Sequence, residues 1–270
     1  TTHGRITLLN SVIRGNTGMC GGGVFGDTAD IIIMNCMIEQ NDCSADGGGI
    51  SINYGDLQLT NSSVSSNTGA AVAGGIYIYR SSYNVQGSNI SFNVSGSEGG
   101  GIWIRGSGTL INDTIFNNSA SAKGGGIVYF SGGSVLIDSC DISENTAEQY
   151  GAGISFDGDS LLIRNSKLAR DTLMGAWDGG GGIYVAPNRY IKIENSEVRS
   201  CYSASEGGAA YFASGVHATL DSCLIIGNYA FTNGGGVATY ELGTTIINAS
   251  SLDSNHAEYY GGGYYNFCHD

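Results

Sequence analysis

The chain has 270 residues, of which 45 are Gly, one is Pro and 41% are hydrophobic. This composition excludes collagen, which needs glycine at every third position and abundant proline, and it excludes a disordered chain, which is poor in apolar residues. The net charge is −13, so we expect neither nucleic acid nor an anionic membrane surface as a partner. We also expect no membrane insertion by this segment, because it has no apolar run of about 18 residues.

A cluster of glycines followed by one apolar residue recurs along the whole chain. In chain order, the residue after each cluster is Val24, Ile50, Ile76, Ile102, Ile127, Ile154, Ile183, Ala210, Val237 and Tyr264. Successive members lie 25 to 29 residues apart. A nearly fixed period over ten units predicts a repeat architecture.

A second pattern runs in phase with the first. In each unit an aliphatic residue is followed three positions later by a small polar residue, as in Ile90 and Asn93. We predict an internal ladder of amide side chains along the repeat axis, and we expect its asparagines to take the left-handed backbone conformation at a corner. The ladder asparagines are Asn16, Asn41, Asn67, Asn93, Asn118, Asn145, Asn228 and Asn255, while Asp171 and Cys201 occupy the two remaining positions.

Each unit contains three short stretches in which apolar and polar residues alternate, such as "GIWI" (101–104), "VLIDS" (135–139) and "ISFN" (90–93). Period two and β-branched residues are typical of strands with one buried face, and no stretch has the length or period of a helix. The sequence therefore predicts an all-β parallel solenoid of about ten coils of 25–30 residues with three short strands each. We expect residues 1–270 to form a single domain, as a fragment of a longer protein.

The two patterns resemble the Gly-Gly-Ala-aliphatic and Phe-x-x-Asn repeats of chlamydial polymorphic outer membrane proteins. Gly usually replaces Ala here, and Ile, Val or Leu replaces Phe. The resemblance covers nearly the whole chain and implies a right-handed parallel β-helix that works as an extracellular passenger, adhesin or filament component. It leads us to expect a structural or adhesive protein at the cell surface or outside the cell, without a cofactor.

An enzyme is the first alternative, because parallel β-helices include polysaccharide lyases, epimerases and glycosidases. Asp141, Lys167 and Glu197 share one offset in three successive units, and Arg170 lies beside Glu144 at another. Asp141, Lys167, Arg170 and Glu197 would then supply the acid and base groups. The simpler interpretation, which we favour, is a ladder of alternating charges between neighbouring strands.

A glycan-binding module is the second alternative. The residue that follows each glycine-strand anchor should point away from the core, and several of these residues carry large rings. Such rings either pack across strands or form a binding surface for glycans or proteins. The candidate surface consists of Tyr77, Trp103, Tyr184, Tyr211 and Tyr265, together with Trp177 on the one lengthened loop.

Two cysteines are candidates for a disulfide. Cys20 and Cys43 lie in the same loop of successive units, so we expect them to be close enough to bridge. The other pattern among the cysteines is different: Cys36, Cys140 and Cys223 occupy positions where other units carry Ser. We interpret these three as small inward-facing residues.

Weaker signals concern modification and metal binding. Of the N-x-Ser/Thr motifs, those at Asn61, Asn89 and Asn112 should point outward and are our candidates for N-glycosylation. Asp157 and Asp159 are a weak calcium candidate, because two carboxylates provide too few ligands.

The terminal units look as regular as the middle ones. A solenoid exposes unpaired strands and an apolar cross-section at each end unless something covers them. We therefore expect further coils, another domain or other protein subunits at both ends.

Overall fold

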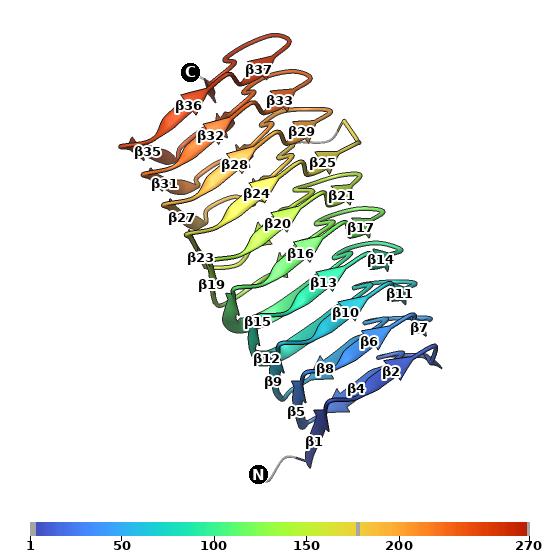
Figure 1. Ribbon diagram of the computed structural model, residues 1–270. Helices are drawn as coiled ribbons and strands as arrows, with labels where there is room; N and C mark the ends of the chain where they lie inside the picture. The colour runs from blue at the N-terminus through green and yellow to red at the C-terminus, as the bar shows by residue number, and fades with distance from the viewer. Residues whose placement is uncertain (1–3, 177–178, 269–270) are drawn as a thin grey trace.

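The computed structural model describes residues 4–176 and 179–268, and these residues wind into a rod of stacked coils with the two termini at opposite ends (Figure 1). The strands of successive coils pair in parallel in all three sheets, and the described residues contain no helix. The predicted all-β parallel solenoid of about ten coils is confirmed. Nothing helical within the described ranges is long and apolar enough to cross a membrane.

The first sheet receives two segments from most coils, one after the glycine cluster and one after a bend. In two coils the segments merge into a single long strand. Its strands are β1 (Gly4–Leu9), β4 (Val24–Asp27), β5 (Ala29–Met34), β8 (Ile50–Asn53), β9 (Asp56–Thr60), β12 (Ile76–Gln86), β15 (Ile102–Ile111), β18 (Ile127–Phe130), β19 (Ser134–Asp138), β22 (Ile154–Asp157), β23 (Ser160–Arg164), β26 (Ile183–Val185), β27 (Tyr190–Glu194), β30 (Ala210–Phe212), β31 (His217–Asp221), β34 (Val237–Tyr240), β35 (Thr244–Asn248) and β38 (Tyr264–Phe267).

The second sheet is made of the three-residue strands that precede the ladder positions. They are β2 (Val12–Arg14), β6 (Met37–Glu39), β10 (Ser63–Ser65), β13 (Asn89–Ser91), β16 (Thr114–Phe116), β20 (Asp141–Ser143), β24 (Lys167–Ala169), β28 (Glu197–Arg199), β32 (Leu224–Ile226) and β36 (Ser251–Asp253).

The third sheet has strands of two residues each, too short for a period-two pattern to show in the sequence. They are β3 (Thr17–Gly18), β7 (Asp42–Cys43), β11 (Thr68–Gly69), β14 (Val94–Ser95), β17 (Ser119–Ala120), β21 (Thr146–Ala147), β25 (Thr172–Leu173), β29 (Tyr202–Ser203), β33 (Tyr229–Ala230) and β37 (His256–Ala257). Two of the three predicted stretches therefore lie in the first sheet. The third sheet, which closes each coil, was not predicted from the sequence.

Aliphatic side chains stack along the axis to form the core. Ile50, Ile76, Ile102 and Ile127 are direct partners in successive coils, and each is 2% exposed or less. One coil cannot bury these side chains alone, so each coil depends on its neighbours for stability.

The predicted amide ladder is confirmed. Asn41 donates from Nδ2 to Oδ1 of Asn67 at 3.0 Å, and Asn67 donates in the same way to Asn93 at 3.0 Å. Each of these amides also donates to a strand carbonyl of the preceding coil, as Asn67 does to Ile38 at 2.9 Å. The amide oxygen accepts a backbone N–H as well, as Asn67 Oδ1 does from Asn41 N. A buried ladder amide therefore satisfies its two donors and its acceptor without water.

The expected left-handed conformation falls on a different residue. The residue before the ladder position has positive φ, for example Gln40 (55°), Ser66 (55°) and Glu144 (57°), whereas the ladder asparagines do not. The physical reason is that the ladder side chain must point into the core, so the turn is made by the preceding residue, whose side chain points outward.

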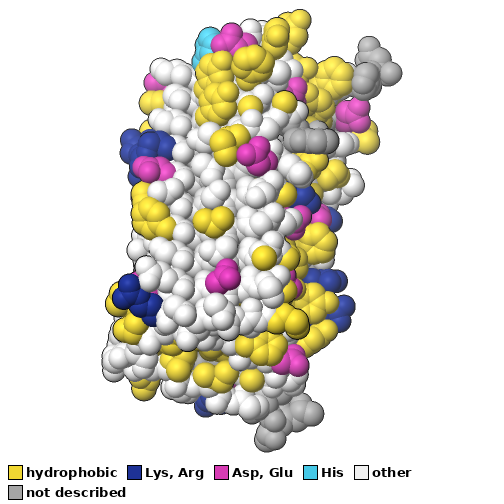
Figure 2. All heavy atoms as spheres, turned by 90° about the vertical axis from the view of Figure 1, so that its right-hand side faces the viewer, with side chains coloured by type: hydrophobic (Ala, Val, Ile, Leu, Met, Phe, Trp, Pro, Cys, Tyr) yellow, Lys and Arg dark blue, Asp and Glu magenta, His cyan; other side chains and the backbone are white. Residues whose placement is uncertain are grey.

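The glycine clusters combine two requirements. The first glycine has positive φ, as at Gly99 (68°). A Cβ on Gly101 would lie 2.6 Å from the carbonyl oxygen of Gly126 and 3.1 Å from Nδ2 of Asn118, so the next coil leaves it no room. Figure 2 shows the side of the rod that carries these corners, where backbone and small polar side chains cover most of the centre.

Two acidic side chains interrupt the polar columns inside the rod. Asp171 accepts from Nδ2 of Asn145 at 3.0 Å with Oδ1, but its buried Oδ2 has no hydrogen-bond partner among the described residues. Burial raises the pKa of Asp171 well above its ordinary value. Burial also raises the pKa of Asp113 to about 7, against the opposing effect of N–H bonds from Ser88 and Ile111. At both sites burial makes the carboxylate less favourable than it is in water.

Candidate binding surfaces on the outside of the solenoid

The charged residues proposed for catalysis lie on the outer face of the second sheet. Asp141, Lys167 and Glu197 are direct partners in β20, β24 and β28. Lys167 Nζ is 3.1 Å from Asp141 Oδ2, and Arg170 Nη2 is 2.6 Å from Glu144 Oε1. The geometry is the cross-coil ion pairing of the simpler interpretation.

These four residues do not share one hollow. A shallow depression near Lys167 and Glu197 also includes Ser196 and Leu224, but Asp141 and Arg170 do not line it. Glu197 lies 3.5 Å from Nε of Arg199 on its own strand. Each proposed acid or base is thus engaged with an oppositely charged neighbour on the half-exposed outer face, where such pairs contribute little to stability.

The predicted aromatic residues form two stacks on the outer face of the first sheet. In one stack, the rings of Tyr77 and Trp103 are 4.9 Å apart at 15°. In the other, those of Tyr184 and Tyr211 are 5.7 Å apart at 10°. Tyr265 adjoins the second stack through Tyr240, at 6.2 Å and 65°.

The stacking leaves little ring surface for a ligand. Trp103 and Tyr211 are each only 7% exposed, and Trp103 Nε1 donates to Glu98 at 3.1 Å. Because a sugar or peptide would stack on a ring face, and these faces cover one another, the arrangement is cross-strand packing. Trp177 lies outside the described residues.

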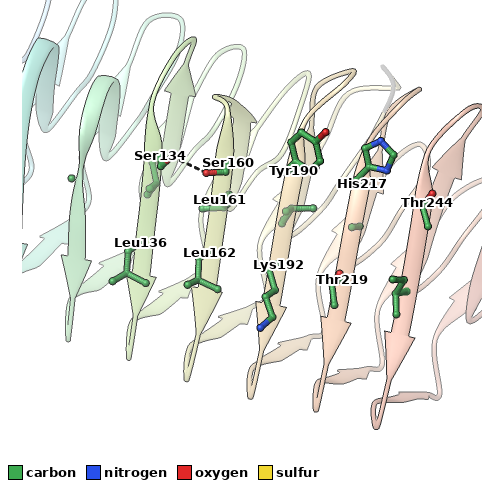
Figure 3. A pocket seen from close by; sticks show the side chains of 15 residues that line it. Ser134, Leu136, Ser160, Leu161, Leu162, Tyr190, Lys192, His217, Thr219 and Thr244 are labelled. Carbon is green, nitrogen blue, oxygen red and sulfur yellow. Dashed lines mark hydrogen bonds between the residues drawn. The ribbon is translucent and has the colours of Figure 1, made fainter.

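A groove crosses the outer face of the second segment of the first sheet, from β15 to β35 (Figure 3). It has a volume of about 680 Å³ and spans five coils from Leu136 to Ile246, about 19 Å at about 4.8 Å per coil. One column of its side chains consists of Leu136, Leu162, Lys192, Thr219 and Ile246, and the other of Ser134, Ser160, Tyr190, His217 and Thr244.

The groove combines apolar side chains with an ion-paired edge. Tyr190 is 61% exposed and stacks on His217 at 5.2 Å. Along one edge, Arg164 Nη2 is 2.9 Å from Asp138 Oδ2, and Lys192 Nζ is 2.5 Å from Glu194 Oε2. Sequence reasoning missed this surface. Its signal in the sequence is Leu136, Leu162 and Ile246, apolar residues at outward positions of the strands.

Comparison with protein families matches the chain to the model described as "Right handed beta helix region", over residues 49–172 and 152–266. These ranges cover well over half of the chain. The protein belongs to the right-handed β-helix family. The coil path and three parallel sheets of this β-helix agree with that assignment. Neither the curated proteins nor the solved structures yield a significant match.

The expected disulfide is not formed in this β-helix, because Cys20 and Cys43 are both free. The register pairs Cys43 with Gly18 rather than with Cys20, and the Cys43 side chain is 1% exposed, inside the coil. The prediction assumed that Cys20 and Cys43 occupy equivalent positions in successive coils, but Cys20 lies two residues beyond the residue that pairs with Cys43. Burial raises the pKa of the Cys43 thiol to about 11. The other cysteine prediction is confirmed, since Cys36, Cys140 and Cys223 are buried.

The two aspartates of the calcium candidate are engaged separately. Arg189 donates to Asp157 Oδ1 at 2.7 and 3.1 Å, and Gly133 N donates to Asp159 Oδ2 at 2.8 Å. Within the described residues, no group of three or more His, Cys, Asp or Glu side chains is placed to hold a metal. The pair is better explained as a structural feature of neighbouring turns.

The three proposed glycosylation sites lie on the surface of the β-helix. Asn61, Asn89 and Asn112 are all exposed. Asn93, whose sequence motif is similar, is fully buried in the amide ladder. Accessibility therefore separates the candidate sequons as expected, while modification itself stays a prediction.

Proposed function

We propose that this β-helix is a structural or adhesive rod that contacts other proteins through the groove between β15 and β35. The observation that supports this function is the composition of the groove: an apolar centre beside an edge of ion pairs. Stable protein interfaces combine an apolar core with a polar rim in the same way. The stacked coils supply a stiff support, because each coil is hydrogen-bonded to the coils next to it.

An extracellular or cell-surface location is part of this proposal. The repeat resemblance to chlamydial polymorphic outer membrane proteins supports it, as do the exposed asparagines of the three candidate sequons. The acidic net charge of −13 favours a protein partner over nucleic acid.

Site-specific crosslinking in the native source tests the groove. A photoreactive amino acid at Leu162 should crosslink to a bound protein, because this side chain lies in the apolar column of the groove. The matched control is Gln58, an exposed residue of the same outward column in an earlier coil. Crosslinking at Leu162 but not at Gln58 is the expected result, and equal yields at both positions would contradict the proposal.

The enzyme alternative predicts a different outcome. Polysaccharide turnover by the purified protein, lost on Lys167→Ala with the fold intact, would replace the structural proposal with a catalytic one. We expect no turnover that depends on Lys167, because its ammonium group is paired with Asp141 at 3.1 Å.

A further inference from the structure

The outward aromatic column of the first sheet is interrupted in the middle of the rod. The rings that border the interruption are Phe130, stacked on Trp103 at 5.6 Å, and Tyr184, which packs against Tyr150 at 4.8 Å. Between them, the outward positions hold the smaller residues Val128 and Ser155. Ser51 and Ala238 also interrupt the column, but each is a single small residue, whereas here two small residues follow one another in successive coils.

A pocket of about 280 Å³ occupies the interruption. Val128 and Ser155 line it together with the rings of Phe130, Tyr150 and Tyr184. Sites for drug-sized ligands measure about 300–1,000 Å³, so this pocket has room for a single ring. Aromatic walls around a small concave site are typical of ligand binding.

Two charged side chains supply hydrogen-bonding groups at the pocket. Lys123 Nζ is 3.2 Å from Glu98 Oε1 and 5.6 Å from the centre of the Tyr150 ring. The ammonium group has three donors, so a single acceptor does not satisfy it. Both hydrogen bonds from Arg189 go to Asp157 Oδ1, and Oδ2 accepts no hydrogen bond from the described residues. The ion pairs fix the position of one donor group and one acceptor group.

We propose that this pocket binds one neutral pyranose ring of a glycan. The C–H face of a sugar suits an aromatic wall, and its hydroxyls can accept from Lys123 and donate to Asp157 Oδ2. A neutral ring fits because Glu98 and Arg189 already balance the two charges. An aromatic side chain of a protein would instead cover the ammonium and carboxylate groups without giving both a partner, which costs free energy.

This site goes beyond the proposed function, since it does not share the groove. Titration of the isotope-labelled protein with methyl glycosides of glucose, galactose, mannose and N-acetylglucosamine tests it by NMR. We expect at least one glycoside to bind with a dissociation constant in the millimolar range and to shift the amide signals of Ser155 and Asp157. Asp157→Asn should weaken this binding at least fivefold, whereas Asp27→Asn, at an equivalent strand end in the first coil, should not change it.

A second variant fills the pocket. Ser155→Tyr places in the column the residue type that other coils have at the same position, Tyr77 and Tyr184. The variant should therefore fold, and its ring should fill the pocket and abolish binding. If this variant does not fold, the comparison of Asp157→Asn with Asp27→Asn still tests whether the glycoside binds in the pocket. The proposal is overturned if no glycoside shifts these amides up to about 50 mM, or if binding persists in folded Ser155→Tyr. Crosslinking at Leu162 is independent of either result, so the two proposals fail separately.

Discussion

At the scale of single residues, the interior of the rod depends on buried polar side chains whose donors and acceptors pair with those of the coils above and below. An asparagine in the ladder donates twice and accepts twice, as Asn67 does with Asn41, Asn93 and Ile38. A carboxylate cannot donate, either at Asp171 in this ladder or at Asp113 in the separate column of Ser62 and Ser88. Asp113 and Asp171 are therefore the positions where the sequence departs from the most stable choice.

Asp113→Ser should become more stable relative to the parent protein as the pH rises, because the variant does not lose the contribution that Asp113 loses. The pKa of Asp113 in the fold is about 7, above the value of about 3.9 in an unfolded chain. Its contribution is thus fully present below about pH 4 and is lost as the pH rises to about 7, a change of about 1 to 4 kcal/mol. Serine fills the same position at Ser62 and Ser88, where its hydroxyl accepts and donates without ionising.

Urea denaturation at several pH values between 4 and 8 measures this effect. The difference in midpoint between Asp113→Ser and the parent protein should grow steadily with pH. Parallel curves for the two proteins would show that Asp113 is not the titrating group.

At the scale of one coil, the glycine corner sets how closely neighbours approach. At Gly100 and Gly101 a Cβ would lie 2.4 and 2.6 Å from carbonyl oxygens of the next coil, so a methyl group has no room there, whereas two other coils hold Ala152 and Ala209 at the corresponding positions. Gly227 is a contrasting case, since it has positive φ (62°) but only Ser200 Oγ, at 4.0 Å, near its Cβ position. Crowding and backbone conformation can therefore be tested separately.

Gly101→Ala should destabilise the rod by more than about 2 kcal/mol, because its Cβ would lie 2.6 Å from the Gly126 carbonyl oxygen. Gly227→Ala should cost only about 1 kcal/mol, the usual penalty of a left-handed alanine. Denaturation midpoints of the two variants give the comparison. Equal losses would mean that crowding at Gly101 costs no more than the left-handed conformation at Gly227, and would contradict the prediction.

At the scale of the whole molecule, the two terminal coils differ from the rest. Ile247 occupies an inward column and pairs with the buried Leu220, yet it is 39% exposed because no described coil covers it. Ile13 at the other end packs on the core but is only partly buried. We propose that further coils or another subunit cover both ends.

This proposal predicts that the 270-residue segment associates through its ends as its concentration rises. Ile247→Lys should reduce this association, because a charge on the exposed end opposes contact. Met174→Lys, at an exposed residue of the lengthened loop, is the matched control. Sedimentation velocity measures the effect, and a monodisperse monomer at all concentrations would count against covered ends.

The sequence by itself determined the fold, the coil period and the amide ladder. These features recur along the chain, apart from Asp171 and Cys201 in the ladder, so the same local requirement leaves the same residue types at a nearly fixed spacing. The inward Ile102 and Asn93 could be placed without coordinates because the core and ladder admit few alternatives. The residue that takes the left-handed conformation at the corner could not be predicted. Glycine and asparagine both suit such a turn, and only the backbone shows which position has positive φ.

The outer surface was decided by the tertiary structure. Whether Trp103 offers its ring or covers it depends on the neighbours it meets in adjacent coils, and the sequence does not give their side-chain orientations. The groove at Leu162 and the pocket at Ser155 arise in the same way, from small or apolar residues that only coil stacking places side by side. Inward positions are fixed by a repeated environment, whereas outward ones vary from coil to coil and acquire their chemistry from contacts between distant parts of the chain.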